Sequence, residues 1–264
     1  MARRARLDAE LVRRGLAASR ERAQGLVSAG LVSVAGRPAT KSATAVAPDE
    51  PVTVRADPTG PAYASRGAHK LAHALHTFAL DLTGRRALDA GASTGGFTDV
   101  LLRAGVAHVV AADVGYGQLA WALRTDPRVT VLDRTNVRFL TELPGGPVDV
   151  VTADLSFIPL GLVLPALAAV STPAADLVVL VKPQFEVGRA ALGDGGVVRD
   201  PSARAAAVLR VAAQAAALGL GGAGVTASPL PGPAGNVEYL LWLRRDAGPL
   251  RPEAVERAVS AGPS

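Results

Sequence analysis

The chain has 264 residues, a net charge of +5 and no cysteine, which excludes disulfides, thiolate metal sites and cysteine nucleophiles. No metal site is predicted, and no segment offers the roughly 20 mostly apolar residues that a membrane-spanning helix needs. Because no secretory signal is recognised either, we expect a cytoplasmic protein with no membrane partner.

Residues 1–57 predict a small, basic α+β domain. They contain ten basic and six acidic side chains, an excess that favours a polyanionic partner. Apolar spacing predicts one helix from Leu7 that stops near Gly15 and a second from Ser19 to Ala29. Short alternating strands are expected at 32–34 and 52–54.

This order of elements resembles the S4 RNA-binding domain over residues 5–55. The matching positions are Arg6-Leu7-Asp8, Gly15, Ser19-Arg20, Ala23, Gly30, Val32, Val34, Gly36 and Lys41. In that family a basic helix face binds folded RNA, so the resemblance implies RNA contacts from Arg4, Arg6, Arg20 and Lys41. The alternative is that these cations form a solvated surface.

A linker rich in proline and glycine is expected at 58–66, followed by a domain at 67–245 and a tail at 246–264. Repeated βα units in the domain predict an α/β, Rossmann-like fold: a mostly parallel seven-stranded sheet with an antiparallel edge strand. The predicted strands are 86–90, 108–113, 129–133, 148–154, 176–181, 224–228 and 237–243. The predicted helices are 67–78, 97–104, 118–124, 160–170 and 202–218.

A glycine turn between the first strand and its helix, at 88–99, is the most informative segment. Dinucleotide-binding folds use G-x-G-x-x-G, whereas these glycines are spaced G-x-x-x-G-G with Ser93 at the second position. This spacing disfavours an NAD oxidoreductase and favours the amino-acid end of S-adenosylmethionine. Asp113, after the next strand, is placed for ribose hydroxyls. The alternative is a turn that only closes a βα unit.

The remaining candidate cofactor contacts follow from the same topology. The residues expected around the methionine part are Gly91, Ser93, Thr94, Gly95 and Phe97. Asp133 and Asn136 follow the third strand and are expected near the adenine.

Four charged residues stand out. Asp154 and Lys182 directly follow apolar strands, Glu238 stands at the start of the last strand, and Lys70 lies near the start of the first helix. Each alone could be structural. Together they resemble the Lys-Asp-Lys-Glu tetrad of the FtsJ-type ribose 2′-O-methyltransferases. The chain is further similar to the TlyA (hemolysin A) family in the stretches 65–71, 91–97, 134–138, 153–158 and 181–186.

The TlyA resemblance implies an S-adenosylmethionine-dependent 2′-O-methyltransferase that acts on cytidine in ribosomal RNA of the small or large subunit. It further implies an effect on sensitivity to ribosome-targeting antibiotics. The substrate would be rRNA in ribosomal subunits or assembled ribosomes, and the oligomeric state is not indicated. Two alternatives are an RNA-binding or ribosome-associated protein with an inactive methyltransferase fold, and a hemolysin.

Lys182 is the candidate base for the ribose 2′-hydroxyl, or the cation that stabilises the developing alkoxide. Asp154 would orient Lys182, while Lys70 and Glu238 would hold the target ribose and its phosphate. Phe157 is a candidate for stacking on a base, with core packing as the alternative. The long 183–200 connection is expected to be a mobile flap or a surface loop without a role. Arg66 and Arg189 are candidate RNA contacts.

Overall fold

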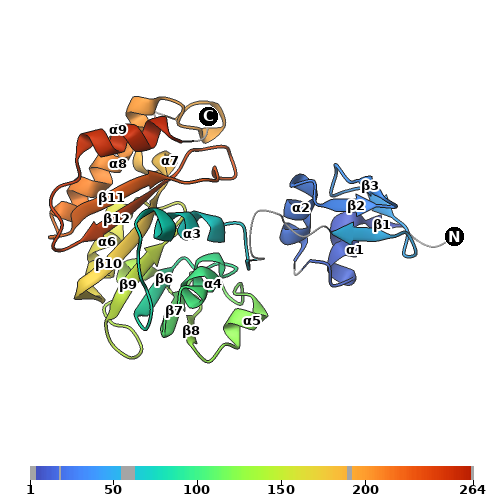
Figure 1. Ribbon diagram of the computed structural model, residues 1–264, viewed down its shortest axis with the longest axis horizontal. Helices are drawn as coiled ribbons and strands as arrows, with labels where there is room; N and C mark the ends of the chain where they lie inside the picture. Colours follow the sequence, from blue (N-terminus) through green and yellow to red (C-terminus); the bar gives the residue numbers. More distant parts are fainter. Residues whose placement is uncertain (1–3, 18, 55–62, 189–191, 263–264) are drawn as a thin grey trace. The chain divides into compact units, whose positions relative to one another are not determined.

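The computed structural model describes residues 4–17, 19–54, 63–188 and 192–262. The chain divides into two compact units, residues 1–62 and 63–264, each with its own core. Figure 1 draws both units. Arg189 lies outside the described residues.

The first unit has the predicted helices and strands around a small apolar core. Two helices, α1 (Leu7–Arg13) and α2 (Arg20–Ser28), share this core with two small antiparallel sheets. One sheet has the order β3-β2-β5 and the other pairs β1 with β4. The strands are β1 (Ala5–Arg6), β2 (Val32–Val34), β3 (Arg37–Pro38), β4 (Ala45–Val46) and β5 (Val52–Val54).

The second unit is built on a seven-stranded sheet of order β11-β12-β10-β9-β6-β7-β8. Pairing is parallel from β10 through β8, and β12 is antiparallel to both of its neighbours, β10 and β11. The predicted fold class is therefore confirmed. The strands are β6 (Arg86–Ala90), β7 (His108–Ala112), β8 (Val129–Leu132), β9 (Val148–Ala153), β10 (Ser171–Val181), β11 (Gly221–Ala227) and β12 (Tyr239–Arg244).

Helices cover both faces of this sheet because successive strand side chains point to opposite sides. In β10, Val178 and Leu180 join the core under α3 and α4, whereas Leu177 and Val179 join the core under α6 and α8. Figure 1 shows the resulting layers. The helices are α3 (Ala68–Thr77), α4 (Gly96–Arg103), α5 (Trp121–Arg124), α6 (Leu164–Ala169), α7 (Pro183–Glu186), α8 (Pro201–Ala216) and α9 (Pro252–Ser260), with 3-10 turns η1 (Val137–Phe139), η2 (Leu160–Leu162) and η4 (Asp194–Gly196).

Several elements differ from the sequence prediction: β11 begins at Gly221, three residues early, and the predicted helix 160–170 is divided into η2 and α6. Helix α5 begins three residues later than expected, and β10 begins at Ser171. The expected tail contains α9, whose Val255 and Ala258 are buried in the core with α8. The 183–200 connection includes α7 and η4, and the side chain of Asn236 binds the backbone of Val198 and Gly196 there.

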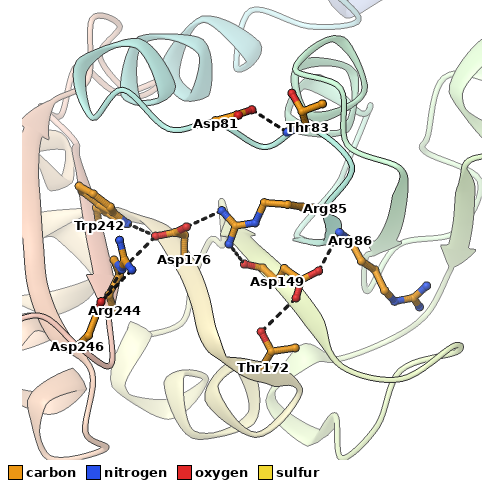
Figure 2. A network of polar contacts seen from close by, with 10 residues as sticks. All are labelled: Asp81, Thr83, Arg85, Arg86, Asp149, Thr172, Asp176, Trp242, Arg244 and Asp246. Atoms are coloured by element: carbon orange, nitrogen blue, oxygen red, sulfur yellow. Dashed lines mark hydrogen bonds and ion pairs between the residues drawn. The ribbon is translucent and has the colours of Figure 1, made fainter.

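A polar network ties the strands together near the amino ends of β6 and β9 (Figure 2). The Arg85 guanidinium forms an ion pair with Asp176 at 2.6 Å, and the Trp242 indole N–H donates to the same carboxylate at 2.7 Å. Arg85 also donates to the carbonyl of Asp149, whose carboxylate accepts from Thr172. These contacts join β6, β9, β10 and β12, so we interpret the network as structural.

Candidate active site

The glycine turn after β6 packs too tightly for larger residues at two positions. Gly91 has φ +86°, and a Cβ there would lie 2.5 Å from the backbone oxygen of Asp154. Gly95 has φ +96°, and its Cβ would lie 2.3 Å from Leu123 Cδ1. Glycine tolerates both the left-handed backbone and the close approach. The two glycines therefore let the turn pack directly against Asp154 and Leu123, and Ser93 between them remains exposed.

The connection after β7 folds across this turn. The Ser93 N–H donates to the Asp113 carboxylate at 2.9 Å, and the Gly115 N–H donates to it at 2.7 Å. The Ala120 N–H donates to the Thr94 carbonyl at 3.2 Å. Asp113 is thus held at the turn, with acceptor capacity left for ligand hydroxyls.

Asp133 and Asn136 follow β8, and both take part in local contacts. Asp133 forms an ion pair with Arg124 at 2.8 Å, and hydrogen bonding from Arg124 lowers the pKa of Asp133. The Asn136 side-chain oxygen accepts from the Arg138 N–H at 3.1 Å and caps η1. Asp133 therefore anchors α5, whereas the side-chain amide of Asn136 retains donors for a ligand.

Lys182 and Asp154 form one ion pair at the carboxyl ends of β10 and β9. Lys182 Nζ lies 2.6 Å from Asp154 Oδ1 and 2.9 Å from the Ser156 hydroxyl. The lysine is buried, while Asp154 is partly exposed. A lysine ammonium has three N–H donors, so one remains for a ligand in this geometry. Ser156 was not singled out from the sequence as a contact of the lysine.

Lys70 and Glu238 form a second buried ion pair. Lys70, in the first turn of α3, places its Nζ 2.5 Å from Glu238 Oε2. Glu238 precedes β12, and its backbone carbonyl accepts from the Ser228 N–H. Glu238 is only 1% exposed, so the lysine supplies the counter-charge that its burial requires.

Strand pairing brings the two ion pairs to the same edge of the sheet. Val181 pairs with Tyr239 in the antiparallel β10–β12 ladder. Extending that register by one residue places Lys182 opposite Glu238. Asp154 adjoins the glycine turn, since its N–H donates to the Ala90 carbonyl at 3.0 Å. The structure thus gathers all four predicted residues of the tetrad beside the glycine turn.

Phe157 is unusual in both exposure and backbone conformation. Its side chain is 90% exposed and its φ is +63°, a conformation that is strained for a bulky residue. The ring lies 5.2 Å from the ring of Phe185 in α7. Core packing, the alternative considered from the sequence, is therefore wrong. Such strain is often found at functional sites.

Asp89 is a buried acid in β6 that the sequence prediction did not include among the site residues. Its carboxylate accepts from the Thr98 hydroxyl at 2.6 Å, and Thr152 lies at 3.5 Å. Burial raises the pKa of Asp89 to about 7, and the charge of Asp154 adds to the effect. The signal was available, because an aspartate stands inside an apolar strand directly before the turn.

The predicted RNA-contacting cations are exposed wherever they are described: Arg4, Arg6, Arg20, Lys41 and Arg66. Arg6 and Arg20 both reach the fully buried carboxylate of Asp8, at 2.9 Å and 3.2 Å. Hydrogen bonding from Arg6 holds the pKa of Asp8 well below its usual range. Asp8 was part of the S4 pattern, but its role in grouping two arginines became visible only in the structure.

Comparison with known proteins identifies the same two domains in this chain. Residues 63–245 match the FtsJ-like methyltransferase family, and residues 5–52 match the S4 domain. The chain is 61% identical over 269 residues to the 16S/23S rRNA (cytidine-2′-O)-methyltransferase TlyA of Mycobacterium tuberculosis, covering 100% of both chains. It is 34% identical to Hemolysin A of Brachyspira hyodysenteriae, covering 89% of this chain and 98% of the other.

A solved structure named "putative hemolysin", from Streptococcus thermophilus, superposes with a TM-score of 0.79 at 36% identity, covering 98% of this chain and 96% of that one. Family matches, full-length identity and shared fold lead to one assignment. The chain belongs to the FtsJ-like methyltransferases, within the TlyA family that joins this domain to an N-terminal S4 domain.

Proposed function

We propose that this protein transfers a methyl group from S-adenosylmethionine to the ribose 2′-oxygen of a cytidine in ribosomal RNA. The observation that supports this most directly is the pairing of Lys182 with Asp154, and of Lys70 with Glu238, beside the glycine turn. Its relatives include an enzyme whose name states this reaction. We further propose that the substrate is rRNA within ribosomal subunits or assembled ribosomes, in the cytoplasm.

The residues at the turn fit S-adenosylmethionine. Gly91 and Gly95 let the turn pack against Asp154 and Leu123, and Asp113 has acceptor capacity for ribose hydroxyls. Ser93 and Thr94 would complete the surroundings of the methionine part, whereas the predicted contact Phe97 is buried in the core under α3 and α4. Asn136 offers amide donors toward the adenine. Asp133 is a weaker candidate for the adenine, since it is already bound to Arg124. S-adenosylmethionine would supply an electrophilic methyl group on sulfur.

Lys182 would act on the nucleophile, the ribose 2′-hydroxyl. Two of its three N–H donors are directed to Asp154 and Ser156, and the third is available for the 2′-oxygen. As the new oxygen–carbon bond forms and the sulfur–carbon bond breaks, negative charge on that oxygen is stabilised by the ammonium. The hydroxyl proton leaves to solvent.

Lys70 and Glu238 would position the target nucleotide. Their ion pair is buried and lies next to Lys182 through the β10–β12 register. Lys70 retains N–H donors for a phosphate oxygen, and the buried carboxylate of Glu238 would hold that lysine in place. Phe157 would stack on the target base, an expectation supported by its exposure and left-handed backbone.

The hemolysin alternative gains no support from the site. Among the described residues, no helix is both long and apolar enough to cross a membrane. The relative named Hemolysin A aligns with 89% of this chain. The relative that is 61% identical over the whole chain is named for rRNA methylation, so we do not propose lysis.

The direct test is methyl transfer from tritiated S-adenosylmethionine to small subunits, large subunits and assembled ribosomes prepared from cells that lack this protein. Mass mapping of rRNA fragments should locate the label on a cytidine ribose. Calorimetric titration of the methyl donor provides the control for cofactor binding. Donor binding without transfer to any particle would favour the inactive-fold alternative.

A further inference from the structure

Large apolar side chains are exposed at one edge of the seven-stranded sheet. In the described part of the second unit they all follow the carboxyl ends of β7, β8 or β9: Val114, Tyr116, Trp121, Phe139, Phe157 and Leu162. Trp121 is 76% exposed, and Tyr116 and Phe139 are 68% and 70% exposed. Exposed apolar side chains gathered on one edge in this way indicate an interaction surface.

The segments that present Tyr116 and Trp121 are held in place by hydrogen bonds. The Arg134 N–H donates to the Gly115 carbonyl at 2.8 Å, which links the connections after β7 and β8. The Ala120 N–H binds the glycine turn at Thr94, so Trp121 directly follows a residue fixed to the methyl-donor site. The surface therefore adjoins the site without depending on the tetrad.

Arginines accompany the exposed rings. The Arg134 guanidinium lies 4.6 Å from the Tyr116 ring centroid, and that of Arg138 lies 5.5 Å from the Phe139 ring centroid. Arg134 has φ +54°, so its backbone is held in an uncommon conformation.

Neighbouring arginines differ in their charge partners. Arg124 and Arg128 each form an ion pair with an aspartate at 2.8 Å. Arg134 and Arg138 form no ion pair within 4.0 Å of a carboxylate in the described part of the chain, and both are exposed; the charge of Arg134 adds only a small contribution to the lowered pKa of Asp133. Their positive charge is therefore available to a polyanion.

We propose that Tyr116, Trp121 and Phe139, with Arg134 and Arg138, form a stacking surface for the single-stranded RNA that flanks the methylated cytidine. This inference rests on the proposed function and names where the flanking strand binds. Flat rings beside unpaired guanidiniums match the two repeating parts of such a strand, its bases and its phosphates. Every base has a stacking face, so the surface should bind flanking nucleotides with little sequence preference.

The intrinsic fluorescence of the protein offers a direct test, because the chain has two tryptophans, Trp121 and Trp242. Trp242 is partly buried against Phe78 and bound to Asp176. A labelled single-stranded oligocytidylate of about 12 nucleotides is a suitable probe. With saturating S-adenosylmethionine, its binding should quench the emission of the wild-type protein. The Trp121→Phe variant, which retains Trp242, should lose that quenching.

Affinities of variants for the same oligonucleotide complete the test. Trp121→Ala and Phe139→Ala should each weaken binding by about 5- to 150-fold, the range for loss of one base stack. Arg134→Ala and Arg138→Ala should each reduce the salt dependence of binding by about one phosphate contact. Arg128→Ala is the matched control, because that exposed arginine is already paired, and it should change neither quantity.

The affinity for S-adenosylmethionine, measured by calorimetry, should be unchanged in all of these variants. Loss of donor affinity with intact RNA binding would instead make Trp121 a wall of the donor pocket and would overturn the inference. Failure of the wild-type protein to bind the oligonucleotide, or binding without tryptophan quenching, would overturn it too. Neither result would affect methyl transfer to ribosomal particles, so the proposed function is tested separately.

Discussion

Replacing Gly91 by alanine should destabilise the second unit. The loss should be larger than for alanine at another left-handed glycine whose Cβ would meet no neighbouring atom. Alanine at φ +86° costs about 1–2 kcal/mol for the left-handed backbone. Its Cβ would lie 2.5 Å from the Asp154 backbone oxygen, and such overpacking adds about 1–3 kcal/mol. The expected loss in the free energy of unfolding is therefore about 2–5 kcal/mol.

Gly84→Ala is the matched control for this prediction. Gly84 has φ +74°, but a Cβ there would meet nothing within 4 Å, so only the backbone cost of about 1–2 kcal/mol applies. At about 2–4 °C per kcal/mol, Gly91→Ala should lower Tm by about 4–20 °C and Gly84→Ala by about 2–8 °C. Calorimetric unfolding of both variants measures the difference.

The Gly91→Ala variant should also lose methyl-transfer activity, since relief of the clash requires the backbone at Asp154 to move. Activity is measured well below Tm, so that the folded fraction does not limit the comparison. Equal destabilisation by the two alanines would refute the close contact between the glycine turn and Asp154. Full activity of Gly91→Ala would refute the connection from that contact to catalysis.

The remaining predictions concern three carboxylate or lysine sites. Lys182→Ala should reduce kcat by about 10²–10⁴-fold with donor affinity retained, and a normal kcat would exclude Lys182 from the chemistry. Asp8→Asn should raise the Kd for RNA by about tenfold through loss of a charge-assisted contact, whereas Glu10→Gln, on the same helix, should leave it unchanged. Burial raises the pKa of Asp89 to about 7, so between about pH 4 and 7 the native state keeps a proton that the unfolded state releases. The free energy of unfolding should therefore fall as the pH rises through this range. Urea unfolding across this range should give a flatter profile for Asp89→Asn, and identical profiles would contradict the assignment.

Much of the fold was predictable because it follows from local patterns. The apolar segments of β6, β7 and β9 end within one residue of their predicted limits. Helix α5 is shorter than predicted since Gln118 and Ala120 serve the glycine turn instead of a helix. Helix α9 was missed in a segment that was expected to be a tail, although Val255 and Ala258 have helical spacing.

The sequence alone determined which residues stand at strand ends, since alternation and glycine turns depend on neighbours along the chain. It therefore placed Asp154 and Lys182 at one edge of a parallel sheet. Only the tertiary structure decided which charges meet: Lys70 reaches Glu238, 168 positions away, and two arginines converge on Asp8. Such pairs form because helix packing brings distant residues together and because a buried charge requires an opposite charge nearby. The local spacing of residues in the sequence specifies neither condition.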